Sequence, residues 1–172
     1  MKKAIIIIAT VIISVSSFGQ KFTLNELIKM NSMDWDNFDT YVTKKGYYYS
    51  GNEKTSYVQD NGKHMEYEYD GKICKGERYI NKTQFTNGLY LISFQTYDKS
   101  DYISIKDQLK AAGFKYSNTH NLDESISKNA VELIYYKGNM ELDLISALEK
   151  NNGGRYANNT FYEISITNRI TQ

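Results

Sequence analysis

The chain has 172 residues, of which 41% are hydrophobic and 24% are charged, and its formal net charge at pH 7 is +1. The hydrophobic content and the 16 tyrosines argue against an intrinsically disordered chain. The balanced charge gives no support for nucleic-acid binding through phosphate neutralisation. The length suits one domain or two small modules that pack closely.

Residues 1–19 have the pattern of a bacterial export signal. Two lysines at the start precede an apolar run over residues 4–15, which is too short to span a bilayer comfortably. Ser17 and Gly19 are small residues at the positions that a signal peptidase reads. We expect Gln20 to begin the mature chain, in the periplasm or outside the cell. An uncleaved membrane anchor is the alternative. Removing two of the 21 basic residues leaves 19 against 20 acidic ones, a net charge near −1.

Residues 22–30 carry the start signals of a helix. Thr23 and Glu26 have the spacing of a capping box, in which each side chain accepts a hydrogen bond from the other residue's backbone. Phe22 and Leu27 stand where a hydrophobic staple closes over the first turn.

The next segment, residues 34–49, predicts a second helix, a glycine stop and a strand. Asp34 can cap the helix start, and Gly46 stands where a left-handed residue often ends a helix. Three consecutive tyrosines then favour an extended chain. The apolar stripe of this helix, at helical spacing, consists of Trp35, Phe38 and Val42.

Residues 101–116 repeat these features about 67 positions later. Asp101 takes the place of the capping Asp34, and Gly113 takes the place of Gly46. The corresponding stripe is Tyr102, Ile105 and Leu109. Further on, Tyr90, Ile92, Ser93 and Phe94 match Tyr162, Ile164, Ser165 and Ile166. The order of these matches predicts an internal duplication, and chance similarity between two segments of the same kind is the alternative.

Antiparallel strands are predicted after each of these helices. Residues 64–70 alternate apolar and charged side chains, the pattern of a half-buried strand, and end in an Asp-Gly hairpin turn. Residues 72–80 form the returning strand, and an Asn-Gly turn leads into residues 89–97.

In the second copy, residues 117–129 are polar and predict a loop. Residues 131–136 and 140–145 form a hairpin. Residues 146–150 are either the end of that strand or a helical turn, and residues 161–167 close the sheet.

The expected fold class is α+β, with two tandem helix-plus-antiparallel-sheet modules. Residues 20–100 form the first module, with an extra N-terminal helix, and residues 101–172 form the second. Each helix is expected to cover one sheet face with its apolar stripe. This layout resembles that of the β-lactamase inhibitory protein family, which is also exported and built from tandem helix-and-sheet modules. The resemblance is one of architecture without a shared motif, so it implies a fold and no activity.

Side chains that could carry chemistry are few and isolated. Cys74 is the only cysteine, so no intramolecular disulfide can form. Lys72 and Lys75 could lower the pKa of its thiol, but a small strand residue is the simpler interpretation, and an intermolecular bridge stays open. The two histidines, His64 and His120, have no second ligand at metal spacing.

Carboxylates give no stronger signal. Asp34, Asp36 and Asp39 resemble part of a calcium loop, but its sixth position needs glycine and holds Asp39 here. Glu66 and Glu68 share a strand face and could act as an acid/base pair, although a solvated sheet face explains them as well. A Gly-x-Ser-x-Gly elbow is absent. We therefore expect no catalytic, metal or cofactor site, and whether the protein is an enzyme stays open.

The aromatic residues divide between the two faces of the predicted sheets. Those assigned inward are Tyr47, Tyr49, Tyr67, Tyr69, Tyr90, Tyr116, Tyr136 and Tyr162. The opposite faces present Tyr48, Tyr97, Tyr135 and Phe161 as a candidate binding surface. Tyrosine offers a large contact area and a hydrogen bond, which suits binding of a protein or a glycan. Tyrosine richness without any partner is the alternative.

The sequence therefore predicts an exported, non-enzymatic bacterial binding module. Its partner is expected to be a protein, with an enzyme that it inhibits as one candidate. A small periplasmic hydrolase or glycan-processing enzyme is the first alternative, and a structural envelope protein is the second. No nucleic-acid partner is expected, and contact with a membrane is expected only through the uncleaved signal sequence.

Overall fold

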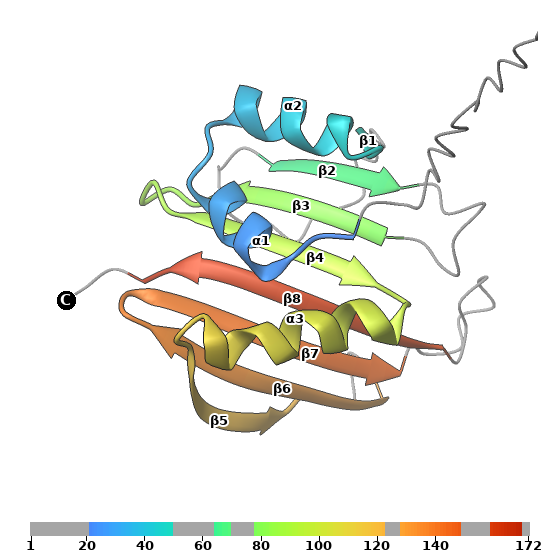
Figure 1. Ribbon diagram of the computed structural model, residues 1–172, viewed down its shortest axis with the longest axis vertical. Coiled ribbons are helices and arrows are strands. Elements are labelled where there is room, and N and C mark those ends of the chain that lie inside the picture. Colours follow the sequence, from blue (N-terminus) through green and yellow to red (C-terminus); the bar gives the residue numbers. More distant parts are fainter. Residues whose placement is uncertain (1–20, 50–63, 70–77, 123–127, 149–158, 170–172) are drawn as a thin grey trace, which may run out of the picture.

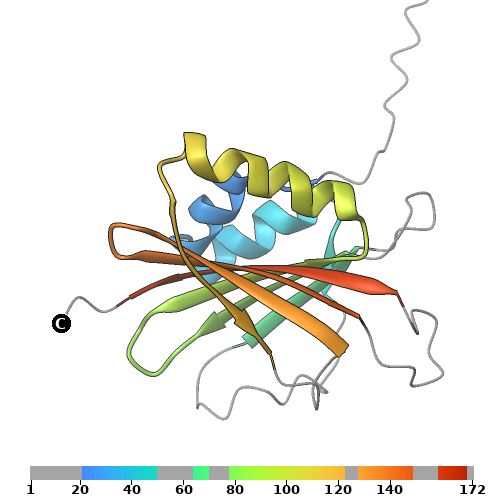
Figure 2. The ribbon, with the colours of Figure 1, turned by 90° about the horizontal axis from the view of Figure 1, so that it is seen from below.

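The computed structural model describes residues 21–49, 64–69, 78–122, 128–148 and 159–169, where three helices cover one face of an eight-stranded antiparallel sheet (Figures 1 and 2). The helices are α1 (Leu24–Asn31), α2 (Trp35–Lys44) and α3 (Lys99–Ala111). The strands are β1 (Tyr48–Tyr49), β2 (His64–Tyr69), β3 (Arg78–Gln84), β4 (Tyr90–Thr96), β5 (Lys115–Asn121), β6 (Lys128–Lys137), β7 (Met140–Leu148) and β8 (Thr160–Asn168). The fold is mixed α+β and mostly sheet, as the sequence predicts.

The strands form one continuous sheet in the order β1-β2-β3-β4-β8-β7-β6-β5. The two predicted groups of strands join where β4 pairs with β8, with Ser93 opposite Ser165. The expectation of two units side by side did not include this junction, because pairing between distant strands leaves no local pattern in the sequence.

Helix α1 begins as its sequence predicts. The Oγ1 atom of Thr23 accepts a hydrogen bond from the Glu26 backbone N–H at 3.3 Å, and Glu26 Oε2 accepts one from the Thr23 N–H at 2.8 Å. At the other end, the Asn31 side-chain amide donates to the carbonyl oxygens of Tyr90 and Ile166, at 2.8 and 3.0 Å. Helix α1 is therefore anchored over the junction of β4 and β8.

The capping box gives the first testable prediction. Thr23→Ala is expected to lower the free energy of unfolding by about 1 kcal/mol, because it removes the acceptor of the Glu26 N–H. Urea denaturation measures the loss. The control Thr40→Ala changes an exposed threonine inside α2 and should be neutral or slightly stabilising. Equal behaviour of the two variants would contradict a stabilising cap.

The starts of α2 and α3 differ from each other. Asp34 caps α2 as predicted, and its Oδ1 accepts from the Asn37 N–H at 2.8 Å. Helix α3 begins at Lys99, and its cap is Asp98, which accepts from the Ser100 N–H at 2.8 Å. The prediction that Asp101 caps this helix is therefore wrong. Asp101 lies inside the first turn, where its buried carboxylate pairs with Arg78 of β3.

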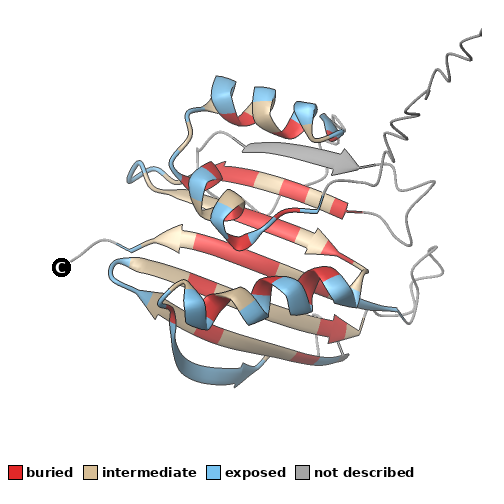
Figure 3. Ribbon diagram, viewed as in Figure 1, coloured by how far each residue is buried: buried red, intermediate tan, exposed pale blue. Residues whose placement is uncertain are grey.

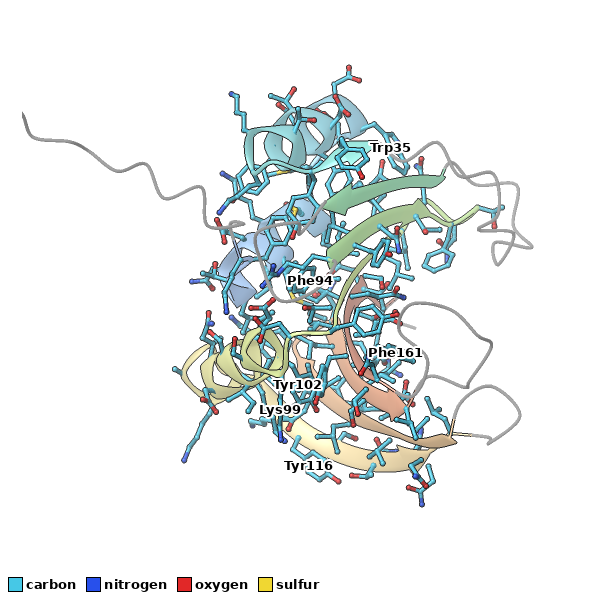
Figure 4. The ribbon with its side chains drawn as sticks, turned by 90° about the vertical axis from the view of Figure 1, so that its right-hand side faces the viewer. Trp35, Phe94, Lys99, Tyr102, Tyr116 and Phe161 are labelled. Carbon is cyan, nitrogen blue, oxygen red and sulfur yellow. The ribbon has the colours of Figure 1, made fainter. Side chains whose placement is uncertain are left out.

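The hydrophobic core lies between the helices and the sheet (Figure 3). Both predicted stripes face it, with Trp35 half-buried and the other five residues buried. Phe22 packs edge-on against Phe94 with ring centroids 5.4 Å apart, and Tyr102 packs against Tyr162 at 4.9 Å. Figure 4 shows Phe94 and Tyr102 on the helix side of the sheet. This side contains the large apolar residues that fix the strand orientation.

Strands β3, β5 and β7 extend beyond the limits predicted for them. Strand β3 continues to Gln84, and β7 continues to Leu148, so residues 146–148 are strand. Strand β5 covers residues 115–121, most of which were predicted to be a loop. All seven of its side chains are exposed, so it shows no apolar alternation, and its pairing with β6 is what defines it as a strand.

The predicted export signal, residues 1–19, lies outside the described residues. Within the described ranges, no helix combines the length and the apolar character that a membrane crossing requires.

Candidate binding surface

The face of the sheet opposite the helices carries a row of residues in register across all eight strands. Ile92, Phe94, Ile164 and Ile166 point toward the helices, so Gln95 and Glu163 point away from them. The register pairs extend this row from Gln95 and Glu163 to both edges of the sheet. From β1 to β5 its positions are Tyr48, Glu68, Tyr79, Gln95, Glu163, Ile145, Glu132 and His120. We call this side the helix-free face.

Glu163 is the centre of a hydrogen-bond network on the helix-free face. Its Oε1 accepts from Ser93 Oγ at 2.6 Å and from Ser165 Oγ at 3.0 Å, and its Oε2 accepts from Gln95 Nε2 at 3.0 Å. Both serines are buried. The network fixes the Glu163 carboxylate at the middle of the sheet.

Asp143 of β7 lies next to this network, directly opposite Ser165. Its Oδ1 is buried and has no hydrogen-bond partner among the described residues. Burial, together with the negative charges of Glu141, Glu132 and Glu163, raises the pKa of Asp143 to about 7. The helix-free face therefore holds a carboxyl group that is partly protonated at neutral pH.

A hydrogen-bonded pair and an ion pair flank Asp143. His120 Nδ1 lies 3.1 Å from Glu132 Oε2 at the β5 edge. Arg169 Nε lies 3.4 Å from Glu141 Oε2, and its guanidinium lies 4.8 Å from the centre of the Tyr136 ring. The helix-free face thus combines aromatic rings with several carboxylates.

The structure does not bring the four predicted surface aromatics together. Tyr48 is 48% exposed at the β1 edge, and half-buried Phe161 lies on the helix-free face opposite Ala147 (Figure 4). Tyr97 is half-buried and directly follows β4. Tyr135 lies on the helix side, packed against the core, with its ring 5.7 Å from that of Tyr116.

The placement of Tyr135 corrects the predicted orientation of β6. Leu133 and Tyr135 pack against the core, so Tyr136 lies on the helix-free face. The sequence has tyrosine at both 135 and 136, and either residue satisfies an inward aromatic pattern. A shift of one position reverses every side chain of a strand.

The other inward assignments give mixed outcomes. Tyr47 and Tyr162 are buried as predicted, and Tyr90 is half-buried. Tyr116 pairs with Tyr135 and so lies on the predicted side of the sheet, but it is 56% exposed at the β5 edge and is not part of the core (Figure 4). Some residues singled out in the sequence lie outside the described residues, namely Lys72, Cys74 and Lys75. For others only the backbone is described: Tyr49, His64, Glu66, Tyr67, Glu68 and Tyr69.

Sequence reasoning missed a buried lysine on the helix side of β3. Lys82 is 0% exposed, and its ammonium donates to the carbonyl oxygen of Met30 at 2.8 Å and lies 4.0 Å from the centre of the Tyr90 ring. Burial lowers the pKa of Lys82 to about 8, partly opposed by the charge of Asp34. Alternation from Ile80 could have placed Lys82 on the inward side, but the predicted strand ended at residue 80.

Two open pockets lie near the sheet edge and the helices. One, of about 380 Å³, lies where α3 runs into β5 and includes Lys115 and Lys137. The other, of about 350 Å³, lies between α1 and α2 and includes Lys29 and Tyr41. In the described part of the chain, no three histidine, cysteine or acidic side chains are grouped so that they could hold a metal ion.

Comparison of the chain with protein-family models, curated proteins and solved structures found no match in any of the three.

Proposed function

We propose that the protein is a non-enzymatic module that binds a protein partner on the helix-free face of its sheet. The observation that carries this proposal is the placement of all three described helices on the other face (Figure 2). Half-exposed Phe161 and Tyr136 supply contact area on the helix-free face, and the Glu132–His120 and Glu141–Arg169 pairs supply polar groups at its periphery. Large aromatic contacts with peripheral charges are characteristic of protein interfaces.

The proposed location of this activity is outside the cytoplasm. Residues 1–19 would direct export and be removed, and the mature protein would act in the periplasm or outside the cell. A glycan is the alternative ligand for the same aromatic residues.

We also propose that the two halves of the sheet arose by duplication, in a layout like that of the β-lactamase inhibitory protein family. Supporting this, the order α2-β1-β2-β3-β4 recurs as α3-β5-β6-β7-β8, and β4 and β8 meet at the centre of the sheet. Both helices end with the same hydrogen bond, from Tyr47 N–H to the Val42 carbonyl and from Phe114 N–H to the Leu109 carbonyl. The matched residues Ser93 and Ser165 lie opposite each other.

Site-specific photo-cross-linking tests the proposed binding face. A benzophenone amino acid replaces Phe161 in one variant and Ile103 in the matched control. Ile103 is 42% exposed and belongs to α3, on the other side of the molecule. Irradiation in the native cell envelope should give a discrete protein adduct from position 161 and none from position 103. Adducts from position 103 alone, or from neither position, would contradict binding at the helix-free face.

One observation favours the enzymatic alternative. A carboxyl group whose pKa is raised to about 7, beside the hydrogen-bond network of Glu163, suits general acid catalysis of glycan or ester hydrolysis. Asp143→Asn should then abolish hydrolysis of peptidoglycan fragments while urea denaturation stays cooperative. No hydrolysis by the unmodified protein between pH 5 and 9 would remove this alternative.

A further inference from the structure

Strand β5 forms an accessible edge of the sheet. It pairs with β6, and the strand order ends there within the described residues. All seven residues of β5 are exposed, whereas β1 at the opposite edge has only two residues (Figure 3). Natural edge strands are usually kept short, charged or covered. Among the described residues, β5 is protected by Lys115 and by the irregularity at Ser117, and the stretch from Asn118 to Asn121 contains no lysine, acid or proline.

The open pocket of about 380 Å³ lies at the beginning of this strand. Its lining includes Lys115 and Lys137, both exposed, and the hydroxyl-bearing residues Tyr116, Ser117 and Tyr136, with no acidic residue. The nearby carboxylate of Glu141 is paired with Arg169. The pocket therefore offers the ammonium groups of two lysines and the Ser117 hydroxyl to an anion, because the Tyr116 hydroxyl lies beside Thr119 and that of Tyr136 bonds to Glu141.

We propose that β5 binds the extended C-terminal segment of another protein, which adds antiparallel to β5 and places its terminal carboxylate between Lys115 and Lys137. In antiparallel addition, the end of the added strand lies beside the beginning of β5, which is where the pocket is. Backbone hydrogen bonds along β5 bind the segment, and the two lysines recognise its free carboxylate.

Exposed Tyr116 supplies an apolar contact for the last side chains of the bound segment. Its ring packs edge-on against Tyr135, and its hydroxyl lies 2.7 Å from Thr119 Oγ1, so its position is fixed before binding. This edge site includes Tyr136, which also lies on the helix-free face, but its contacts along the β5 backbone do not depend on the proposed function of that face.

The probe is a library of random eight-residue peptides with free C-termini. A selected peptide is then synthesised as the acid and as the C-terminal amide, and both are titrated against the protein by fluorescence anisotropy. The acid should bind at least about tenfold more tightly than the amide. Backbone amide shifts in two-dimensional NMR spectra should change along residues 115–121 and not at residues 48–49.

The variant Lys115→Gln/Lys137→Gln should remove the preference for the acid. The control variant Lys99→Gln/Lys106→Gln removes two exposed lysines of α3 and should retain the preference for the acid. It is matched because Lys106 lies over the Tyr102 ring much as Lys137 lies over the Phe114 ring. A peptide methylated on its backbone nitrogens should lose binding. Equal binding of acid and amide, shifts confined to residues outside β5 and the pocket, or no selected peptide would each overturn the proposal. Cross-linking at position 161 would be unaffected by any of these results.

Discussion

Replacing Asp101 by alanine is expected to lower the free energy of unfolding by about 3–5 kcal/mol, because it leaves a buried guanidinium without its main partner. Arg78 is 2% exposed, and its Nε lies 2.6 Å from Oδ2 of the fully buried Asp101 side chain. Its other ion pair, with Asp98 at 3.3 Å, reaches a carboxylate that is 25% exposed and serves as the α3 cap. Asp98 therefore cannot replace Asp101. Urea denaturation followed by the fluorescence of the single tryptophan measures the loss.

Two controls separate burial of the charge from simple loss of an ion pair. Lys21 also contacts Asp101, at 2.8 Å, but is 49% exposed, so Lys21→Ala should cost no more than about 1 kcal/mol. The double variant Arg78→Met/Asp101→Leu removes both charges and should recover much of the stability lost in Asp101→Ala. If Asp101→Ala cost no more than Lys21→Ala, the pair would not be the buried anchor of α3 to β3.

Elements with local signals could be predicted from the sequence. Thr23 and Glu26 lie three positions apart and mark the start of α1 without help from the rest of the chain. Gly46 and Gly113 both adopt positive φ, at 89° and 85°, where glycine meets little steric penalty. Most of the strands could be predicted because their apolar and polar residues alternate, which indicates that one face of the strand is buried. Strand β5 has no buried face and so carried no such pattern.

Features that depend on distant partners could not be predicted. Arg78 and Lys82 resemble solvent-exposed cations in the sequence. Their partners, Asp101 and the carbonyl end of α1, reach them only through the completed fold. The predicted place of Tyr135 on the candidate binding surface is wrong for the same reason. The orientation of Tyr135 follows from which face of β6 meets the core, and two adjacent tyrosines do not reveal it.

Raising the pH from 7 to 9.5 is expected to increase the free energy of unfolding through Lys82 by about 2 kcal/mol. The pKa of Lys82 is about 8 in the folded protein and 10.5 in the unfolded chain. Below pH 8 both states carry the charge, so its burial destabilises the fold. Between pH 8 and 10.5 the folded state releases its proton while the unfolded chain keeps it. Stability therefore rises with pH in this window.

Tyrosine ionisation sets the upper limit of the measurement. Burial raises the pKa values of Tyr41, Tyr102 and Tyr162 above 10 in the folded protein, so above pH 10 the unfolded chain loses protons first and stability falls. Urea denaturation is therefore measured at intervals from pH 7 to 9.5, and the difference between the unmodified protein and Lys82→Met gives the Lys82 contribution. Lys82→Met should remove the rise, while Lys29→Met, which removes an exposed lysine from α1, should retain it. Parallel pH profiles for Lys82→Met and the unmodified protein would show that the buried ammonium keeps its charge. In that case, the carbonyl groups of Met30 and Asn31 and the ring of Tyr90 would compensate for the water that it lost.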